Sequence, residues 1–453
     1  MVLTLSPASR RLARAVSLLA PTIGAGTPAA AQLLQDAPTV VVPPEPPIAT
    51  GQSVFARQQP VGVADRVLPA FSAHGTTIGA FDLFPAVSIG GLYASNVLAN
   101  NEDRRSDIAI VVRPEITVRT STGPYRIAAY GRGDIRRYAH QTSEDTEEVL
   151  GGVEGSVALG SLSSITAGAS YGSLIEPRYA SDSPVNAAKP LEYDAFSAFG
   201  SATIEGASTR VILRGGVVSL RFGETPGTDG GLLYTRDRDR TRYQGLVRLE
   251  RALSPAVSVY GAATGNRITY AVDAVGDGDG SGAGTRDSTG FGVYAGSSFE
   301  VTSLMRGDVR VGYIRQDFDR RGIRPLSGIG ALGTLVYSPS GLRTITGKVE
   351  SSIEDSGVPG SGGFLHRGGS LRVDNELRRY IVLSLEGGYF RDTYRGLNRQ
   401  DRLPYADAGV TYLSRGHWNA RLGYRYLARS SGQASGVASF DDHRVSVTLT
   451  LQD

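Results

Sequence analysis

Apolar and polar residues alternate along most of the chain after residue 76, with the two-residue period of a β-strand. In the last eleven residues, His443–Asp453, the apolar side chains of Val445, Val447, Leu449 and Leu451 fall at every second position, and Ser, Thr and Gln fall between them. Successive side chains of a strand point to opposite faces, so this segment predicts a strand with one apolar and one polar face.

The same two-faced pattern recurs far upstream of the last strand. It is clear around residues 107–119, 381–389 and 418–426, where Ile, Val, Leu and aromatic residues alternate with charged or hydroxyl residues. Two further segments, 328–337 and 342–350, are apolar enough for strands but give no clean face assignment. Many long two-faced strands in one chain favour a closed barrel in a membrane, because only a closed sheet leaves no unpaired edge in hydrocarbon.

Short turn-like stretches alternate with longer polar stretches between the expected strands. The turns that we identify lie at residues 121–124, 160–163, 205–208, 253–255, 338–341 and 414–417. The longer stretches lie at residues 96–105, 140–146, 174–190, 224–240, 273–286, 319–326, 355–363, 393–401 and 430–441. Nine loops separated by eight turns require about eighteen strands, and short periplasmic turns with long outer loops are typical of outer-membrane barrels. We therefore predict an all-β fold, a transmembrane antiparallel up-and-down β-barrel of about 18 strands, over residues 76–453.

Two segments precede the predicted barrel. Residues 1–31 combine basic residues, a weakly apolar stretch and the small-residue sequence Ala29-Ala30-Ala31, which predicts a secretory signal peptide cleaved before Gln32. Residues 32–75 are Pro-rich, which predicts a periplasmic linker or a segment that plugs the barrel. After the leader there is no run of eighteen apolar residues, so no transmembrane helix is expected.

The polar strand faces carry charges of both signs. Thirteen of these residues are predicted to line an aqueous lumen, which a barrel of this size should contain. They are Arg113, Glu115, Arg119, Arg132, Asp134, Arg136, Arg248, Glu250, Asp308, Arg310, Glu386, Arg421 and Arg425. Two interpretations stay open: the charges pair across strands and support a solvated wall, or they form a selectivity lining for anionic solutes or polysaccharide. Arg132 and Arg136, on either side of Asp134, are the predicted anion contacts. The net charge is only +3 with acids interleaved, so no nucleic-acid surface is expected.

Aromatic residues cluster beside the short turns. They are Tyr125, Tyr337, Tyr380, Tyr412 and Trp418. Tyr and Trp favour the headgroup level of a membrane, because the ring is apolar and its tip is polar. The cluster therefore predicts a membrane-interface girdle on the periplasmic side.

Several short motifs in the chain match a known family. They are Gly79–Pro85, Tyr93–Val97, Arg113–Glu115, Arg286–Gly290 and Arg399–Asp401. From about residue 60 the chain resembles a family of outer-membrane β-barrel porins that are often encoded beside exopolysaccharide synthesis genes in Gram-negative bacteria. The resemblance implies a large single-chain barrel in the cell outer membrane. It also implies a part in exopolysaccharide export, with anionic polysaccharide and periplasmic export components as partners. As a barrel the chain should also meet outer-membrane lipid and the barrel-assembly machinery, although Asp453 stands where such barrels usually end in an aromatic residue.

The sequence offers no constellation that indicates catalysis or a cofactor. His366 and Ser370 share a strand face, but four strand residues span roughly 13 Å, too far for a nucleophile–base contact; a triad assembled across strands stays open. The segment 277–288 begins like a calcium loop, but Ser288 stands where the bidentate Glu is required, so no metal is predicted and a weaker calcium contact at Asp277 and Asp279 stays open. We expect a non-enzymatic channel for polysaccharide export; the alternatives are a general or substrate-specific diffusion porin, or a surface barrel that binds a partner through its outer loops.

Overall fold

The computed structural model describes eleven parts of the chain. They are residues 62–63, 71, 73–121, 125–160, 162–271, 286–302, 304–319, 323–358, 361–415, 417–432 and 439–453. The predicted signal peptide, most of the Pro-rich segment and the calcium-like residues Asp277 and Asp279 lie outside the described residues.

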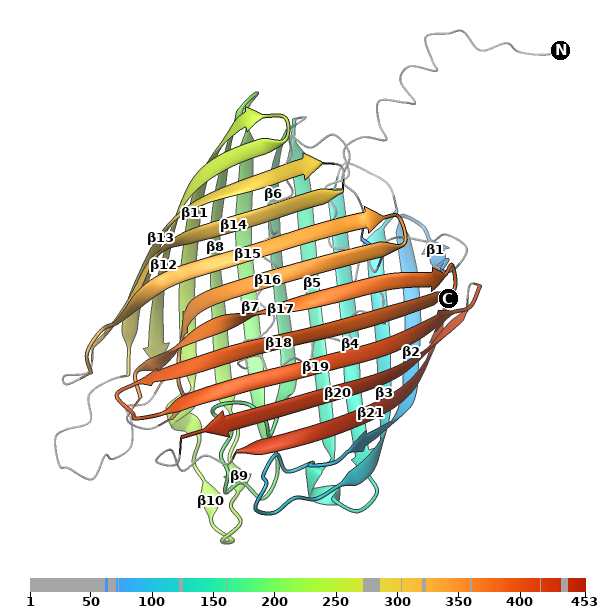
Figure 1. Ribbon diagram of the computed structural model, residues 1–453, viewed down its shortest axis with the longest axis vertical. Coiled ribbons are helices and arrows are strands. Elements are labelled where there is room, and N and C mark those ends of the chain that lie inside the picture. The colour runs from blue at the N-terminus through green and yellow to red at the C-terminus, as the bar shows by residue number, and fades with distance from the viewer. Residues whose placement is uncertain are drawn as a thin grey trace.

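Eighteen long strands form one closed antiparallel barrel (Figure 1). They are β2 (Phe81–Ala94), β3 (Asp107–Thr120), β4 (Tyr125–Tyr138), β5 (Thr146–Leu159), β6 (Ser163–Glu176), β7 (Leu191–Glu205), β8 (Thr209–Phe222), β11 (Arg240–Ser254), β12 (Val257–Tyr270), β13 (Ser288–Thr302), β14 (Met305–Phe318), β15 (Leu326–Ser340), β16 (Arg343–Glu354), β17 (Gly363–Arg378), β18 (Ile381–Arg395), β19 (Gln400–Leu413), β20 (Trp418–Ser431) and β21 (Phe440–Gln452). Each strand pairs with its neighbours in sequence, and β21 pairs with β2 to close the sheet. The predicted fold and strand number are confirmed.

Smaller elements lie at the two ends of the barrel. The strand β1 (Thr76–Ile78) pairs with β2 near the end that holds the C-terminus, and the hairpin β9 (Thr225–Pro226) and β10 (Leu232–Leu233) projects from the opposite end (Figure 1). Two short 3-10 helices occupy Thr142–Glu144 and Arg236–Arg238. Within the described ranges, no helix is long and apolar enough to span a membrane.

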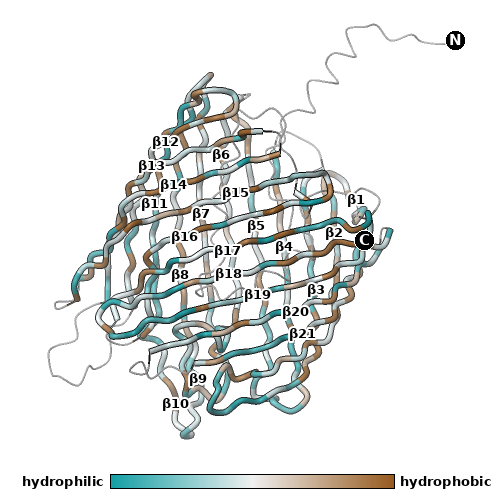
Figure 2. The backbone as a smooth tube through the Cα atoms, viewed as in Figure 1, coloured by the Kyte–Doolittle hydropathy of each residue, from teal (hydrophilic) through white to brown (hydrophobic). Residues whose placement is uncertain are grey.

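The two faces of each strand differ in chemistry. Side chains on the outer face are aliphatic or aromatic and remain exposed to about half of their area: Ile110 is 62% exposed, Leu422 55% and Val447 58%. Figure 2 shows the resulting alternation of hydrophobic and hydrophilic residues along the strands. A continuous exposed apolar face is unfavourable in water at roughly 25 cal/mol per Å², so this face is one that lipid covers.

The two strands without a clean predicted face, β15 and β16, are irregular in the structure. Their pairing runs only from Ala331↔Ser351 to the turn, with a register shift between Tyr337 and Ser340. Gly328, Gly330 and Gly333 lie in β15 and have no side chain to mark a face. In β15 apolar residues lie on both faces, because Leu332 is opposite the inward-facing Arg310 while Leu335 is 40% exposed on the outer face. With glycines at other positions of the strand, the apolar alternation is weak there.

All nine predicted loops connect strands at one end of the barrel, and eight short connections lie at the other end. Two of these connections, at residues 303–304 and 379–380, are not marked by the sequence, because neither contains glycine or proline. Tight turns often use those residues but do not require them.

Candidate functional site: the channel wall and its mouth

The thirteen charged residues predicted from the polar faces all lie on the inner face of the barrel. Their strand register places them at positions that alternate with the exposed aliphatic side chains. Most of them gather in two groups on different parts of the wall, one around β3, β4 and β20 and the other around β11 and β14.

The first group is centred on Asp134. Its carboxylate accepts hydrogen bonds from the Nε atoms of Arg113 at 2.6 Å and Arg136 at 3.1 Å. Arg132 stands directly opposite Glu115 in the β3–β4 register. Each of the two predicted anion contacts therefore has an acid beside it, and neither carries an isolated positive charge.

The same wall continues onto β19, β20 and β21. Asp407 accepts a hydrogen bond from Arg425 at 2.7 Å and lies 3.7 Å from Arg421, and Arg444 lies 2.6 Å from Asp442. A hollow in the inner wall is lined by the five arginines of this region. Those five arginines face the three aspartates 134, 407 and 442. Counted over these eight side chains, two positive charges remain.

The second group is balanced in charge. Arg248 lies 3.1 Å from Glu250 and 3.2 Å from Asp308, and Arg210 lies 3.7 Å from Glu250. The Tyr260 hydroxyl donates to Asp308 at 2.8 Å. Arg210 also lies 3.5 Å from Glu205, and Arg310 is two residues from Asp308 on the same face. Three arginines here accompany three carboxylates, so this group has no net excess of either sign.

The remaining predicted residues have separate partners. The Arg119 guanidinium lies 4.3 Å from the centre of the Phe84 ring, and Arg310 lies 4.9 Å from the ring centre of Tyr294. Glu386 accepts a hydrogen bond from Tyr405 at 2.8 Å. These contacts position the charged groups against the wall and limit their reach into the lumen.

The five aromatic residues beside the turns lie at the turn end of the barrel. Tyr412 contacts both Tyr380 and Trp418, with ring centroids 5.7 Å and 5.4 Å apart. Tyr125 and Tyr337 are exposed, at 62% and 41%. The first three rings make a continuous aromatic surface across β18, β19 and β20.

The mouth contains a feature that the sequence analysis did not identify. The loop of residues 177–190, between β6 and β7 and hereafter the inward loop, reaches the far wall. Arg429 of β20 donates to the carbonyl oxygen atoms of Tyr179 at 3.5 Å and Ala180 at 3.0 Å, and Arg399 donates to that of Ser181 at 2.7 Å. Five strands separate β6 from β20 by the shorter way around the wall, so the loop passes across the opening.

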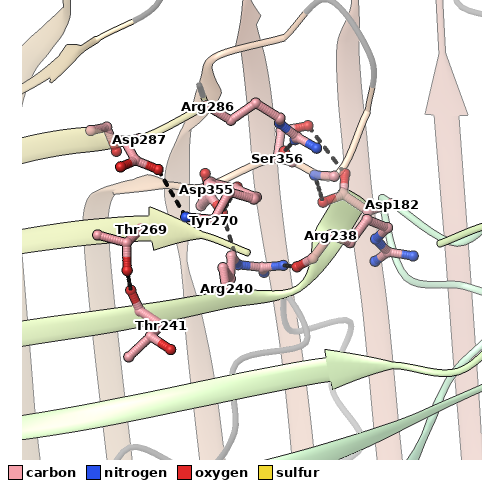
Figure 3. A network of polar contacts seen from close by, with 12 residues as sticks. Asp182, Arg238, Arg240, Thr241, Thr269, Tyr270, Arg286, Asp287, Asp355 and Ser356 are labelled. Carbon is pink, nitrogen blue, oxygen red and sulfur yellow. Dashed lines mark hydrogen bonds and ion pairs between the residues drawn. The ribbon is translucent and has the colours of Figure 1, made fainter. Parts of the chain in front are cut away.

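The tip of the inward loop is bound on a second side. Asp182 accepts hydrogen bonds from the Gly357 amide at 2.6 Å and the Ser356 hydroxyl at 3.4 Å. Figure 3 shows Asp182 beside Ser356 and Arg238. Burial raises the pKa of the Asp182 carboxyl above its usual range, and the nearby charge of Arg238 only partly opposes this effect.

Two ion pairs hold the base of the inward loop. Glu176 accepts two hydrogen bonds from Arg238, at 2.7 Å and 2.9 Å, and Arg178 forms a similar fork with Glu144 at 2.6 Å and 2.9 Å. Burial by itself would lower the pKa of Arg238, but the charge of Glu176 raises it overall. Such bidentate pairs fix direction as well as charge, so they define the path of the loop.

A polar network continues from the loop tip to β11 and β12 (Figure 3). Arg240 lies 2.8 Å from Asp355, which also accepts a hydrogen bond from the Tyr270 hydroxyl. Arg286 donates to the carbonyl oxygen of Ser356. Side chains from distant parts of the wall thus meet at the inward loop and narrow the mouth.

A buried His–Asp pair lies next to this network. The Nδ1 atom of His366 is 2.6 Å from Asp392, and Ser181 donates to the other oxygen of the same carboxylate at 3.2 Å. The serine thus bonds the carboxylate and not the imidazole, which differs from the order that activates a nucleophile. Among the residues that the structure covers, no group of three or more His, Asp or Glu side chains could hold a metal ion.

A family model described as "Putative beta-barrel porin 2" matches residues 68–453. The chain belongs to this porin family. The protein is therefore an outer-membrane β-barrel porin, as the sequence motifs indicated, and its wall meets membrane lipid.

Solved structures resemble the porin in fold alone. The outer membrane protein OpdK of Pseudomonas aeruginosa is 12% identical, with 82% of this chain and 99% of that chain covered and a TM-score of 0.42. The FrpB iron transporter of Neisseria meningitidis is 7% identical, with 82% and 81% covered and a TM-score of 0.42. No curated protein matches the chain. Such low identities and TM-scores lend no support to a shared solute.

Several residues of the porin's wall and mouth were missed from the sequence. A usable signal was an Arg and an Asp two positions apart, because residues i and i+2 of a strand share one face. It occurs at Asp442–Arg444, Arg372–Asp374 and Arg399–Asp401, each of which forms an ion pair in the structure. No comparable signal marks the contacts of Ser181 or Asp182.

Proposed function

We propose that the porin conducts small anionic hydrophilic solutes. The observation that carries this proposal is the arginine-lined hollow on β3, β4, β19, β20 and β21, where five arginines face three aspartates. An excess of fixed positive charge on a pore wall lowers the barrier for anions. The inward loop crosses the mouth and limits the size of what can pass while it is bound.

Export of an anionic exopolysaccharide is the second candidate function. The resemblance of the sequence motifs favours it, and the same basic wall suits a polymer of negative charge. A polymer chain is wider and longer than a small ion, so this function requires the inward loop to leave the mouth. Neither function needs covalent chemistry by the protein.

Bilayer conductance tests the first candidate. The purified porin should prefer anions, and the double variant Arg113→Gln with Arg425→Gln should lose that preference, because it removes the two excess charges. The difference should shrink at 1 M salt, where the screening length is about 3 Å. The matched control is Arg248→Gln with Glu250→Gln on the balanced wall, which should leave selectivity unchanged. Cation preference in the parent protein would rule out the proposal.

A reversible lock on the inward loop separates the two candidates. The chain has no cysteine, and the Asp182 and Ser356 side chains approach to 3.4 Å, so Asp182→Cys with Ser356→Cys offers a single disulfide. A small-anion channel should conduct with the lock closed. An exporter should stop secreting polysaccharide when the disulfide forms and resume after it is reduced. Equal secretion in the oxidised and reduced states would argue against export by this barrel. A surface barrel that only binds a partner through its loops should show neither conduction nor secretion.

A further inference from the structure

Three arginines stand side by side on the outer face of the barrel, close to its loop end. Arg367 of β17 is directly opposite Arg391 of β18, and Arg391 is directly opposite Arg402 of β19. All three side chains are exposed. Directly opposite residues on antiparallel strands have Cβ atoms about 5 Å apart, and like charges at that position repel. We refer to these three residues as the outer arginine row.

The outer arginine row belongs to the lipid-facing surface and not to the lumen. Arg367 shares its face with Leu371, and Arg391 shares its face with Leu385; these leucines are 57% and 45% exposed. The residues that alternate with the row point inward and are buried, as Asp392 shows. The row therefore lies on the surface that the membrane surrounds.

Its height on the wall is that of the membrane interface. Tyr389, two residues closer to the middle of β18 than Arg391, lies on the outer face and is 44% exposed. Tyr424 is 42% exposed on the outer face of β20. Tyrosine marks the headgroup level, and the row lies just beyond it toward the long loops. Because long loops face outward in bacterial barrels, the row meets the headgroups of the outer leaflet.

Three other outer-face arginines near the loop end have acidic partners. Arg137 pairs with Glu147, and Arg315 pairs with Asp317 at 2.6 Å. Arg267 lies 2.7 Å from Asp319. These pairs neutralise charge at the same end of the barrel.

The outer arginine row differs from them in having no carboxylate. Within the described part of the chain, no acid lies within ion-pair distance of its members, and the one hydrogen bond of a guanidinium there is from Arg367 to the Ser351 hydroxyl at 3.4 Å. Three mutually repelling charges without an acidic partner among the described residues favour binding of anions from outside the chain.

We propose that the outer arginine row binds the phosphate groups of a lipid headgroup in the outer leaflet of the outer membrane. Guanidinium groups bind phosphate through paired, charge-assisted hydrogen bonds. Three adjacent guanidiniums can hold a headgroup that carries more than one phosphate, and the exposed outer face lets its acyl chains lie along Leu371 and Leu385. The site is independent of what the lumen conducts.

Retention of lipid by the purified barrel tests the site. The probe is lipopolysaccharide with phosphorylated lipid A, compared with the same lipid after dephosphorylation, scored by native mass spectrometry. The porin should retain the phosphorylated form, and Arg391→Gln with Arg402→Gln should reduce retention by about tenfold or more, since charge-assisted bonds of this kind are strong. The matched control, Arg137→Gln with Glu147→Gln, alters a neutral pair at the same end and should retain lipid normally.

Three results would overturn the lipid site. The first is equal retention by the double variant, the second is equal retention of dephosphorylated lipid by the parent, and the third is full competition by inorganic phosphate. Millimolar inorganic phosphate should compete poorly; full competition would assign a simple anion site instead of a lipid site. A heat-modifiable gel shift reports folding of each variant. Should the double variant fail to fold, Arg391→Lys keeps the charge but loses the planar fork and should reduce retention partially.

Discussion

The mouth and the mid-barrel wall use the same kind of ion pair in different surroundings. At the mouth, the side chains of Arg238 and Glu176 are 7% and 1% exposed. On the wall, those of Arg113 and Asp134 are 27% and 16% exposed. The buried pairs fix the inward loop in place, whereas the wetter pairs leave their charge available to solutes in the lumen.

The surroundings also set the energetic role of each pair. Removing one partner of a buried pair costs about 3–5 kcal/mol, because the other charge stays buried without compensation. A fully exposed pair contributes only about 0–1 kcal/mol, and the partly buried pair on the wall should lie between these two cases. The free energy of unfolding should therefore depend strongly on the ion pairs at the mouth. It should depend less on the ion pairs of the wall.

The largest expected effect comes from breaking the buried pair. Arg238→Met leaves Glu176 buried and unpaired, and it should lower the free energy of unfolding by about 3–5 kcal/mol, measured by urea unfolding in lipid vesicles. The double variant Arg238→Met with Glu176→Leu should recover part of this loss, because Glu176 no longer stays buried as an unpaired charge. The wall control Arg113→Met should cost much less. An equal loss of unfolding free energy in Arg113→Met and Arg238→Met would contradict this difference between wall and mouth.

The next effect concerns the two faces of the wall. Leu385 is 45% exposed on the outer face, and Glu386 accepts a hydrogen bond on the inner face. Leu385→Arg should cost roughly 2–4 kcal/mol if it lies near the middle of the bilayer, while Glu386→Arg should cost much less because water reaches it. The measurement is again unfolding in vesicles. Equal damage by both changes would mean that the faces are assigned wrongly.

The barrel was predictable because its signal is repeated in every strand. Lipid on one face and water on the other force an alternation that the sequence displays at 107–119 or 443–453, and the nine loops follow from the gaps between strands. The sequence was not informative where a strand lacks this alternation or where a turn lacks glycine and proline. In β15, glycines and apolar residues on both faces obscure the alternation, and the connections at 303–304 and 379–380 lack turn residues.

The inward loop could not be predicted for a different reason. Its contacts join residues far apart in sequence: Ser181 and Asp392 are 211 positions apart, and Tyr179 and Arg429 are 250 apart. The sequence pattern of polar loop residues does not distinguish those that face water from those that contact a distant part of the barrel wall. Only the closed barrel brings these partners together, so the path of the loop is a consequence of the fold and not of local pattern.

The smallest expected effect is a pH dependence of the mouth, and it follows from Asp182. Burial raises the pKa of this carboxyl, so the bound loop favours its protonated form. The resulting stabilisation is fully present below the pKa of a free carboxyl and is lost as the pH rises through the raised pKa of the bound loop. Loop binding should therefore weaken with rising pH, and bilayer recordings should show more frequent or larger openings.

A neutral substitute for Asp182 makes this prediction specific. Asp182→Asn keeps an oxygen that can accept the Gly357 amide hydrogen bond but cannot ionise, so the loop should stay bound at every pH and the step in conductance should disappear. Glu102→Gln changes an exposed carboxyl in the connection between β2 and β3 and should leave the step in place. Because the amide of Gly357 and the charge of Arg238 both favour the ionised form, the shift from burial is partly offset and the effect should be modest. An Asp182→Asn channel that keeps the parent's pH response would place the titrating group elsewhere, and the buried His366–Asp392 pair beneath Ser181 would then be the next carboxylate to replace.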